Sequence, residues 1–425
     1  MRLGIFLFLF FGTSLLWGQR LSEKRIARQL QKIEAFQKAH LGISISTLEK
    51  VKPVAAYQAT HYMTPASNTK LLTFLGAIQY FKKLPAVSYF KEQDSVFHFK
   101  STGYPLLFHP FYQDTLLDSF FNQKGSWIYH VNKEPPKPLG SGWAWDDYSY
   151  YYAAERSRFP LFGNVVQAQV VGDTLKTVPS FFESKTVIDT TANAWVRKHK
   201  RNQFYFNPKA WKTADTLYRP FITSDSLFTK LLEEQTHQNV ELVANSKVQL
   251  EWNFLYTDQE EMLYKALLQD SDNGIAEALL LMISQQNFDT MQSDKAIALL
   301  LEQWNAWLPD AVEWVDGSGV SRYNMITPRT LVRVLQKIYK SVGWETIQTY
   351  FPRGASSGTL KQYTHSALYA KTGTLRHNHN LSGYWVHPNG KTYVFSIMVN
   401  HHTTSTAEVR KGIGLLMEWL ERKLR

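Results

Sequence analysis

Three short motifs in this sequence combine residue types that can carry out acyl transfer. They are Ser67-Asn68-Thr69-Lys70, Ser271-Asp272-Asn273 and Lys371-Thr372-Gly373. A serine hydroxyl attacks a carbonyl efficiently only when a neighbouring group takes its proton. A lysine three residues after the serine lies on the same face of a helix and can serve as that group. Together and in this order, the motifs suit acyl transfer on a peptide that ends in a free carboxylate.

In the first motif, Lys70 can act as a base only if its pKa is lowered, because an ammonium group cannot accept a proton. Burial or a second cation lowers a lysine pKa, and Lys371 is the candidate for that cation. Ser67, near a helix N-terminus, would also feel the positive end of the helix dipole, which favours a developing alkoxide. A capping serine and a solvated lysine are the alternative interpretation of this motif.

The second motif lies in a predicted turn between two helices. There the Ser271 hydroxyl can relay a proton to a leaving amine. The Asn273 carboxamide can bind a substrate amide as donor and acceptor together. Helix capping is the alternative, because Ser, Asp and Asn are all preferred capping residues.

The third motif lies on a predicted strand at the edge of a sheet. The Lys371 ammonium and the Thr372 hydroxyl can hold a terminal carboxylate. Gly373 lets a substrate backbone approach closely. The next residue is Thr374, whose backbone N–H is a candidate for an oxyanion hole together with the N–H of Ser67.

The elements that must position these motifs follow from hydrophobic periodicity. The predicted helices cover 21–39, 64–80, 259–286 with a break at the second motif, 293–306, 327–341 and 405–424. The predicted strands cover 41–48, 367–375, 381–387 and 392–400. The last two flank Pro388-Asn389-Gly390, and Asn-Gly is typical of a short hairpin.

The segment between the first two motifs has a different character. It is rich in aromatic residues and strand-like fragments, and helical periodicity is poor. We interpret residues 96–245 as an inserted β-rich region and residues 19–95 with 246–425 as one discontinuous domain. The predicted fold class is α+β, with an antiparallel sheet, the N- and C-terminal helices on one face and a helical cluster on the other.

Residues 1–18 have the organisation of a secretory signal peptide. Arg2 precedes an apolar run from Leu3 to Trp17, and Gly18-Gln19 is a candidate cleavage site. A permanent anchor is the alternative, because the run is near the short limit for a membrane span. The 425-residue chain has no cysteine, so an exported form needs a large core in place of disulfides. Its hydrophobic content of 44% allows one.

The formal net charge of +11 bears on the partners of the chain. Because export separates the protein from nucleic acid, an anionic wall polymer or a membrane surface is the expected partner. Four histidines, His377, His379, His401 and His402, lack the His-Glu-x-x-His pattern, so we expect no metal and no cofactor. A Ser-His-Asp triad is an alternative nucleophile arrangement, but no Gly-x-Ser-x-Gly elbow is present.

The three motifs, in this order, resemble the penicillin-binding protein and serine β-lactamase superfamily. The gap of about 200 residues between the first two motifs is too long for β-lactamases. It is similar to that of the low-molecular-mass class C penicillin-binding proteins, the D-alanyl-D-alanine carboxypeptidase/endopeptidase family, which insert extra domains there. Three further segments also resemble that family: Trp145-Asp146-Asp147-Tyr148, Asp316-Gly317-Ser318-Gly319-Val320-Ser321-Arg322 and Leu381-Ser382-Gly383-Tyr384.

The resemblance implies a penicillin-binding transpeptidase-like fold and a periplasmic serine DD-peptidase acting on peptidoglycan stem peptides. Ser67 would attack the D-Ala-D-Ala carbonyl with Lys70 as the base, and penicillins would acylate Ser67 and leave slowly. Ser271 would pass a proton to the departing D-alanine and Asn273 would hold the substrate amide. Lys371 and Thr372 would bind the terminal carboxylate. Carboxypeptidase and endopeptidase action are both implied.

The resemblance also implies residues that recognise the substrate side chain. Asp147, from the insertion, would meet the free amine of a diaminopimelate side chain, and Arg322 its carboxylate. Arg376, just past the third motif, would lie near the cleft. A surface or structural charge is the alternative for each of the three.

Two alternative functions remain beside the DD-peptidase. One is a non-catalytic cell-wall-binding protein with the same fold, against which the intact motif residues argue. The other is a β-lactamase, which the long insertion disfavours. Rapid turnover of penicillin would distinguish a β-lactamase from a protein that forms a stable adduct.

Overall fold

The computed structural model describes residues 21–92, 95–131, 134–172, 174–212, 216–245 and 250–424. The predicted signal peptide at residues 1–18 lies outside the described residues. Within those described ranges, no helix combines the length and the apolar composition that crossing a bilayer requires.

A five-stranded antiparallel sheet in the described part of the chain has the strand order β14-β15-β16-β1-β2. Its strands are β1 (His40–Thr47), β2 (Ala55–Tyr57), β14 (Leu368–Leu375), β15 (Asn378–Val386) and β16 (Thr392–Asn400). β1 pairs with β16 along its whole length, so the two ends of the chain close one sheet. This arrangement leaves β14, which carries the third motif, at the sheet edge, and it confirms the strands predicted from the sequence.

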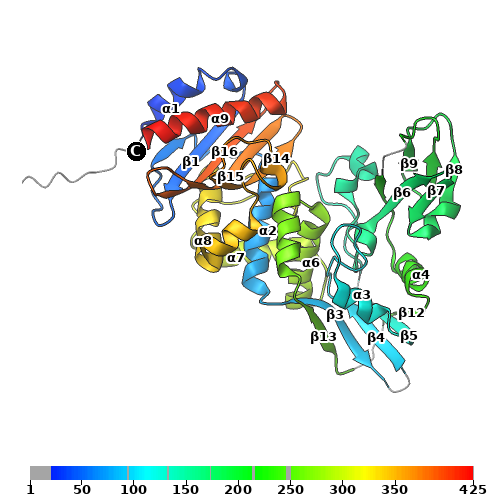
Figure 1. Ribbon diagram of the computed structural model, residues 1–425. Helices are drawn as coiled ribbons and strands as arrows, with labels where there is room; N and C mark the ends of the chain where they lie inside the picture. The colour runs from blue at the N-terminus through cyan, green and yellow to red at the C-terminus, as the bar shows by residue number, and fades with distance from the viewer. Residues whose placement is uncertain are drawn as a thin grey trace, which may run out of the picture.

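Helices cover both faces of this sheet (Figure 1). α1 (Glu23–Leu30) and α9 (Thr406–Lys423) pack on one face, where Ile26, Ile413 and Leu416 join the buried sheet residues in one core. The helices on the other side are α2 (Lys70–Tyr80), α5 (Glu260–Lys265), α6 (Asn273–Phe288), α7 (Ser293–Trp304) and α8 (Pro328–Tyr350). The predicted α+β fold class is thereby confirmed.

α2 and α6 pass through the middle of the helical cluster. In α2, every residue from Lys70 to Ala77 is buried, and in α6 every residue from Ile275 to Ser284 is buried. A helix that is enclosed on all sides loses the amphipathic pattern of a surface helix. Both helices begin at the level of β14, which brings the first two motifs to the third.

Two predicted helices differ from the structure in length. The helix predicted over 21–39 is wrong beyond Leu30, where α1 ends and the chain turns. The turn places Ile33 and Phe36 against Gly412 of α9, where a Cβ would lie 3.0 Å from a carbon of each. The helix predicted over 327–341 continues as α8 to Tyr350, across a non-helical residue at Gly343.

The insertion forms a second half of the molecule (Figure 1). In the described residues, this half contains a five-stranded sheet, β12-β5-β4-β3-β13, to which the insertion supplies the three strands β12, β5 and β4, and two three-stranded sheets, β8-β10-β9 and β11-β6-β7. The strands of the large sheet are β3 (Leu84–Lys91), β4 (Val96–Ser101), β5 (Ser126–Val131), β12 (Asn239–Ala244) and β13 (Asn253–Thr257). The small sheets comprise β6 (Val165–Val171), β7 (Thr174–Val178), β8 (Thr186–Ile188), β9 (Trp195–Arg197), β10 (Phe204–Phe206) and β11 (Leu217–Pro220).

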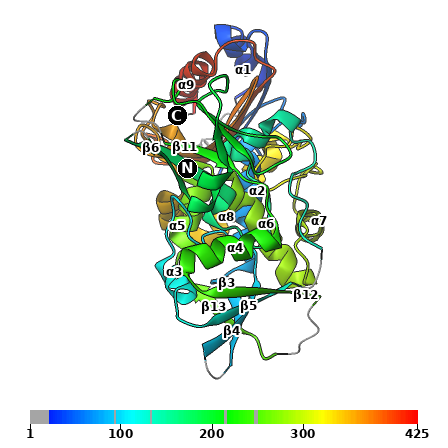
Figure 2. The ribbon, with the colours of Figure 1, turned by 90° about the vertical axis from the view of Figure 1, so that its right-hand side faces the viewer.

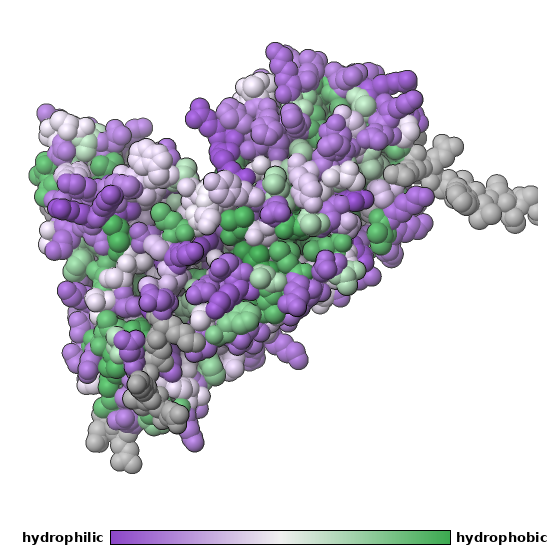
Figure 3. All heavy atoms as spheres, turned by 180° about the vertical axis from the view of Figure 1, so that it is seen from behind, coloured by the Kyte–Doolittle hydropathy of each residue, from purple (hydrophilic) through white to green (hydrophobic). Residues whose placement is uncertain are grey.

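The large sheet carries its own helices. α3 (Thr115–Phe121) and α4 (Asp225–Thr236) lie over it (Figure 2). The β-rich character predicted for residues 96–245 is confirmed. β3 and β13, however, lie outside 96–245 and complete the same sheet, so the domain boundaries stay a prediction. Seen from behind, a notch separates the lobe of the insertion from the lobe of the first sheet (Figure 3).

Candidate active site

The three motifs meet where α2 and α6 begin, beside β14 (Figure 1). Ser67 lies in a 3-10 turn (Ala66–Thr69) that leads into α2. Lys70 Nζ lies 3.1 Å from Ser67 Oγ, 2.6 Å from Asn273 Oδ1 and 2.6 Å from the carbonyl oxygen of Ser318. Lys70 is fully buried, whereas Ser67 is partly exposed. The structure thus pairs the predicted nucleophile with the predicted base.

The surroundings of Lys70 favour its neutral form. Burial lowers the pKa of Lys70 to about 8, although the carboxylates of Asp316, Asp272 and Glu277 act in the opposite direction. Burial, rather than the charge of Lys371 expected from the sequence, is the main cause. A lysine with this pKa is neutral in roughly a tenth of the molecules at pH 7, and in that form it can take a proton from Ser67.

The second lysine, Lys371, contacts the second motif. Lys371 Nζ donates to Ser271 Oγ at 2.8 Å and to the carbonyl oxygen of Thr372 at 3.0 Å. Burial and the nearby charge of Lys70 lower the pKa of Lys371 well below its ordinary value. Two buried amines this close disfavour double protonation, so the pair loses its first proton more readily than an isolated lysine.

One residue of the second motif caps a helix, and the other two contact the lysines of the site. Asp272 caps α6 by accepting the N–H of Ile275 at 2.9 Å. Ser271 has a left-handed backbone (φ 63°), and its hydroxyl contacts Lys371. Asn273 contacts Lys70. The capping interpretation therefore applies to Asp272, while Ser271 and Asn273 each contact one of the two lysines.

The turn that carries Ser67 is fixed by close backbone packing. Gly319 has φ +82°, and a Cβ on it would lie 1.9 Å from the carbonyl oxygen of Ala66 and 3.0 Å from the Ser67 nitrogen. Ala66 itself has a left-handed backbone (φ 50°). The neighbouring Ser318 supplies the carbonyl that binds Lys70. The position of the nucleophile therefore depends on the absence of a side chain at Gly319.

We expect Gly319→Ala to lower the free energy of unfolding by about 2–4 kcal/mol, because the Cβ adds a backbone clash to a strained φ. Gly390→Ala is the matched control, since Gly390 has φ +80° but nothing within 4 Å of a Cβ. Its expected cost is about 1 kcal/mol, from φ alone. Urea denaturation of both variants measures the difference, and equal destabilisation would contradict the close approach at Gly319.

Gly373 also packs closely against the turn that carries Ser67. A Cβ at Gly373 would lie 2.3 Å from the carbonyl oxygen of Pro65 and 2.9 Å from the Asn68 nitrogen. The Asn68 Nδ2 donates to Ser382 Oγ on β15 at 2.8 Å, which ties the turn to the sheet. The sequence analysis did not provide this reason for a glycine, and contact of Gly373 with a substrate stays a prediction.

The two threonines of the third motif have protein partners. Thr372 Oγ1 donates to Thr359 Oγ1 at 2.8 Å, so Thr359 orients a hydroxyl predicted to bind carboxylate. Thr374 is exposed, and its hydroxyl lies 2.8 Å from His379 Nδ1. The oxyanion role of the Thr374 backbone N–H stays a prediction.

Asp147 is connected to the second motif through Tyr152 of the insertion. Tyr152 donates its hydroxyl to Asp147 Oδ1 at 2.7 Å, and its carbonyl oxygen accepts from Asn273 Nδ2 at 2.7 Å. Arg322 and Arg376 are both exposed and lie together, with Arg322 Nη1 donating to the Arg376 carbonyl oxygen at 3.4 Å. The structure thus links Asp147 to Asn273 through Tyr152 and brings the two arginines next to each other.

Buried acids behind Lys70 were missed by the sequence analysis as site residues. Glu277 lies one turn after Asn273 on α6, and Asp316 begins the Asp-Gly-Ser-Gly segment. Burial raises the pKa of Asp316, and the charge of Glu277 raises it further. Glu277 had a detectable signal, because it is an acid inside the apolar run Ile275 to Ile283.

Three of the four histidines considered as metal ligands have side-chain hydrogen bonds to the protein, and the fourth packs against another ring. His379 bonds to Tyr363 and Thr374, His377 to the His402 carbonyl oxygen, and His402 to the Thr404 carbonyl oxygen. His401 packs edge to face against His40. Among the residues that the structure describes, no group of three or more His, Cys, Asp or Glu side chains is arranged to hold a metal.

Comparison with known proteins adds an independent line of argument. A sequence model of the D-Ala-D-Ala carboxypeptidase 3 (S13) family matches residues 22–84 and 135–423. These residues include all three motifs. The intervening residues 85–134 contain the helix α3, nearly all of strand β3, and strands β4 and β5.

Curated relatives match part of the chain. "D-alanyl-D-alanine carboxypeptidase DacB" of Haemophilus influenzae is 26% identical over 173 residues, which cover 38% of this chain and 36% of that protein. "Penicillin-sensitive carboxypeptidase A" of Dictyostelium discoideum is 32% identical over 165 residues, which cover 35% of this chain and 31% of that protein. The matched segments thus span about a third of each relative.

Among solved structures, the crystal structure of penicillin binding protein 4 from Haemophilus influenzae has the same fold. It aligns with a TM-score of 0.71 and 18% identity over 93% of this chain and 99% of that chain. The likeness therefore includes the insertion as well as the sheet and helices that carry the motifs.

Proposed function

Because this chain belongs to the D-Ala-D-Ala carboxypeptidase 3 (S13) family, we propose that it is a serine DD-carboxypeptidase and DD-endopeptidase. Its substrates are the stem peptides of peptidoglycan, and it acts through an acyl-enzyme on Ser67. β-Lactams inhibit it by acylating the same serine. The names of the two curated relatives, a D-alanyl-D-alanine carboxypeptidase and a penicillin-sensitive carboxypeptidase, support this proposal.

One observation carries the proposal: two buried lysines each contact a hydroxyl of the motifs. Lys70 Nζ lies 3.1 Å from Ser67 Oγ, and Lys371 Nζ lies 2.8 Å from Ser271 Oγ. Acyl transfer needs one proton to leave the nucleophile and one to reach the leaving group. The two pairs supply both transfers, and Asn273, which contacts Lys70, is the ligand for the substrate amide.

Acylation follows from this geometry. Ser67 Oγ forms a bond to the substrate carbonyl carbon while its proton moves to Lys70 Nζ. The backbone N–H groups of Ser67 and Thr374 hold the resulting oxyanion. The C–N bond then breaks, and the proton taken from Ser67 passes from Lys70 through Ser271 to the leaving amine, so that Lys70 is neutral again. The carboxylate of the leaving D-amino acid is bound by Lys371 and Thr372.

Deacylation reuses the same groups. A water molecule loses its proton to Lys70 and adds to the acyl carbon. The Ser67 oxygen leaves and recovers its proton, which regenerates the enzyme. With a β-lactam, the opened ring stays attached to the acyl group, so the adduct on Ser67 persists when this step is slow.

We expect Asp147→Asn to lower kcat/KM about 10-fold for a stem peptide that carries a free side-chain amine, because it removes a charge-assisted contact. The same peptide with its amine acetylated should be cleaved equally well by the wild-type protein and by Asp147→Asn. Asp146→Asn is the matched control, since Asp146 is adjacent and exposed. An equal loss of kcat/KM on the two peptides, or an equal loss in Asp147→Asn and Asp146→Asn, would contradict side-chain recognition by Asp147. For the carboxylate of the same substrate side chain, we propose Arg322 and Arg376.

The domain division and the location are part of the proposal. Residues 19–95 and 246–425 form the peptidase domain, and residues 96–245 form the insertion that reads the substrate. Residues 1–18 are a signal peptide that exports the chain to the periplasm. There the net charge of +11 favours association with an anionic wall or membrane surface.

Labelling with a fluorescent penicillin tests the proposal against its alternatives. A stable fluorescent adduct on the wild-type protein is the expected result. Rapid hydrolysis of the penicillin without a lasting adduct would indicate a β-lactamase. Binding to peptidoglycan without an adduct or a product would indicate a non-catalytic wall-binding protein.

A further inference from the structure

We propose that two residues of the insertion, Arg156 and Trp143, are positioning residues for the catalytic base Lys70. They act through the buried acids Glu277 and Asp316, which organise the backbone around the base. The inference rests on the proposed function, in which Lys70 takes the proton of Ser67. It gives the insertion a part in the chemistry, in addition to recognising the substrate.

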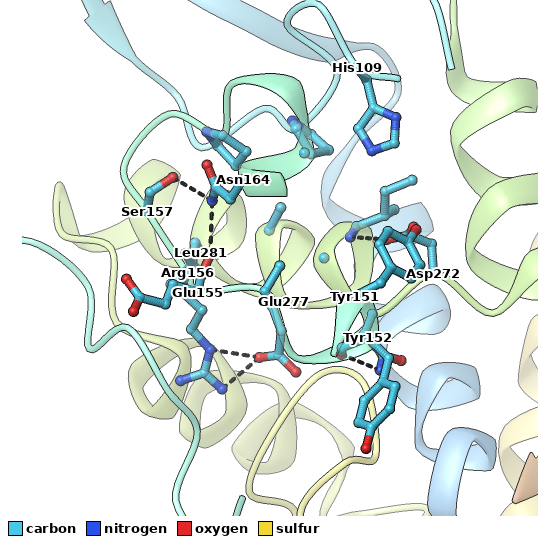
Figure 4. Close-up of a pocket in the computed structure, with 18 of the residues that line it drawn as sticks. His109, Tyr151, Tyr152, Glu155, Arg156, Ser157, Asn164, Asp272, Glu277 and Leu281 are labelled. Carbon is cyan, nitrogen blue, oxygen red and sulfur yellow. Dashed lines mark hydrogen bonds and ion pairs between the residues drawn. The ribbon is translucent and has the colours of Figure 1, made fainter. Parts of the chain in front are cut away.

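The first connection runs from Arg156 to Lys70 in three contacts. Arg156 donates to Glu277 Oε2 through Nε at 2.9 Å and Nη2 at 2.6 Å (Figure 4). Glu277 Oε1 accepts the backbone N–H of Ser318 at 2.8 Å. The carbonyl oxygen of Ser318 accepts from Lys70 Nζ at 2.6 Å. Because Arg156 and Glu277 are 8% and 3% exposed, this connection lies inside the protein.

The second connection runs through Trp143. Trp143 Nε1 donates to Asp316 Oδ2 at 2.8 Å. Asp316 also accepts the backbone N–H groups of Gly319 and Ser321, at 2.8 Å and 2.6 Å. These bonds shape the loop whose glycine packs against the turn of the nucleophile. The insertion therefore supports both partners of the Ser67–Lys70 pair.

The two connections are joined on the side of the insertion. The Arg156 guanidinium lies over the Trp143 ring, 5.4 Å from its centroid, which is a cation–π arrangement. The preceding residue, Gly142, has φ +75°, and a Cβ on it would lie 2.8 Å from Ser321 Oγ. The loop of the insertion thus fits tightly against the loop that carries Asp316 and Ser318.

The charges around Lys70 predict how its basicity changes when Arg156 is removed. The carboxylates that face it are Asp316, Asp272 and Glu277, and the second amine is Lys371 on β14, beside which Asp270 lies. Arg156 offsets the charge of Glu277. Without the guanidinium, the uncompensated carboxylate would make Lys70 hold its proton more tightly and act as a weaker base at neutral pH.

The test measures the rate of penicillin acylation against pH. The wild-type acylation rate should rise with pH, and the midpoint of this rise, the acidic limb of the pH profile, should lie near the Lys70 pKa of about 8. Arg156→Gln should move that limb about one pH unit higher, which means about 10-fold slower acylation at pH 7 and a smaller loss at high pH.

Two further variants separate positioning from general stability. Arg156→Gln combined with Glu277→Gln removes both charges and keeps an oxygen that accepts from Ser318, so the limb should return to its wild-type position. Trp143→Phe removes the N–H bond to Asp316, a carboxylate that faces Lys70, and should also move the limb. It leaves no buried charge unpaired, so it carries the test if Arg156→Gln does not fold.

Arg158→Gln is the matched control, because Arg158 is a half-buried arginine two residues away that pairs with Asp225 at 3.1 Å. Its limb should not move. An unshifted limb in both Arg156→Gln and Trp143→Phe, or an equal shift in Arg158→Gln, would overturn the inference. A wild-type protein that penicillin does not acylate would instead contradict the proposed function.

Discussion

Ser67→Ala is expected to abolish covalent labelling by penicillins and to lower DD-peptidase kcat by about 10⁴-fold or more. The variant removes the oxygen that forms the acyl-enzyme, and the other groups of the site cannot replace it. Intact-protein mass spectrometry after incubation with penicillin measures the adduct, and release of D-alanine from a pentapeptide measures the activity.

The control for this variant is Ser341→Ala. Ser341 is exposed on α8, where its hydroxyl donates to the helix carbonyl of Lys337 at 3.0 Å. It should label and cleave as the wild type does. An adduct of normal mass on Ser67→Ala would show that another residue is the nucleophile and would contradict the mechanism.

The second large effect is expected for Lys70→Arg, which should lower acylation about 10³-fold at every pH up to 10. An arginine keeps its proton throughout this range and cannot act as a base. Lys70→Met, which fills similar space without the amine, should lose as much. The wild-type rate should rise with pH through about 8, because deprotonation of Lys70 creates the base.

Stopped-flow or mass-spectrometric acylation rates from pH 5 to 10 test this expectation. Lys83→Arg is the control, because Lys83 is 64% exposed and pairs with Asp258 on the surface. Substantial acylation by Lys70→Arg would mean that the site needs a positive charge at position 70 and not a base. The proton of Ser67 would then have to leave by another route.

The sequence predicted much of this site because its residue types are restricted by chemistry. The chemistry of hydroxyl, amine and carboxamide groups predicts five site residues: Ser67, Lys70, Ser271, Asn273 and Lys371. The structure brings them into direct contact. The sheet was predictable for a similar reason, since alternating and continuous apolar runs at both ends of the chain have few ways to be buried.

The supporting residues were not predictable in this way. Arg156 and Trp143 are ordinary members of an aromatic-rich segment, and their partners lie more than a hundred residues away. Local pattern does not report such pairs, because only the folded chain brings them together. The end of α1 escaped prediction similarly, since Ile33 and Phe36 continue the helical spacing but pack against Gly412 of α9.

The supporting contacts change the interpretation of the insertion, because they link it to the catalytic motifs. A spacing argument identifies it as an addition between two motifs, and the resemblance assigns it substrate recognition. The structure adds bonds from the insertion to the second motif, through the Tyr152 carbonyl oxygen and Asn273, and to the acids behind Lys70. Residues of the inserted segment and residues near the three motifs are therefore bonded to one another in the folded chain.

The most direct test of the central claim is digestion of purified muropeptides, with monomeric pentapeptides and cross-linked dimers analysed separately by mass spectrometry. The wild-type protein should remove the terminal D-alanine from the monomer and split the dimer at its D-amino acid cross-link. Ser67→Ala should do neither. Muropeptides left unchanged by the wild type, or cleaved equally by Ser67→Ala, would contradict the proposal that the three motifs form a serine DD-peptidase.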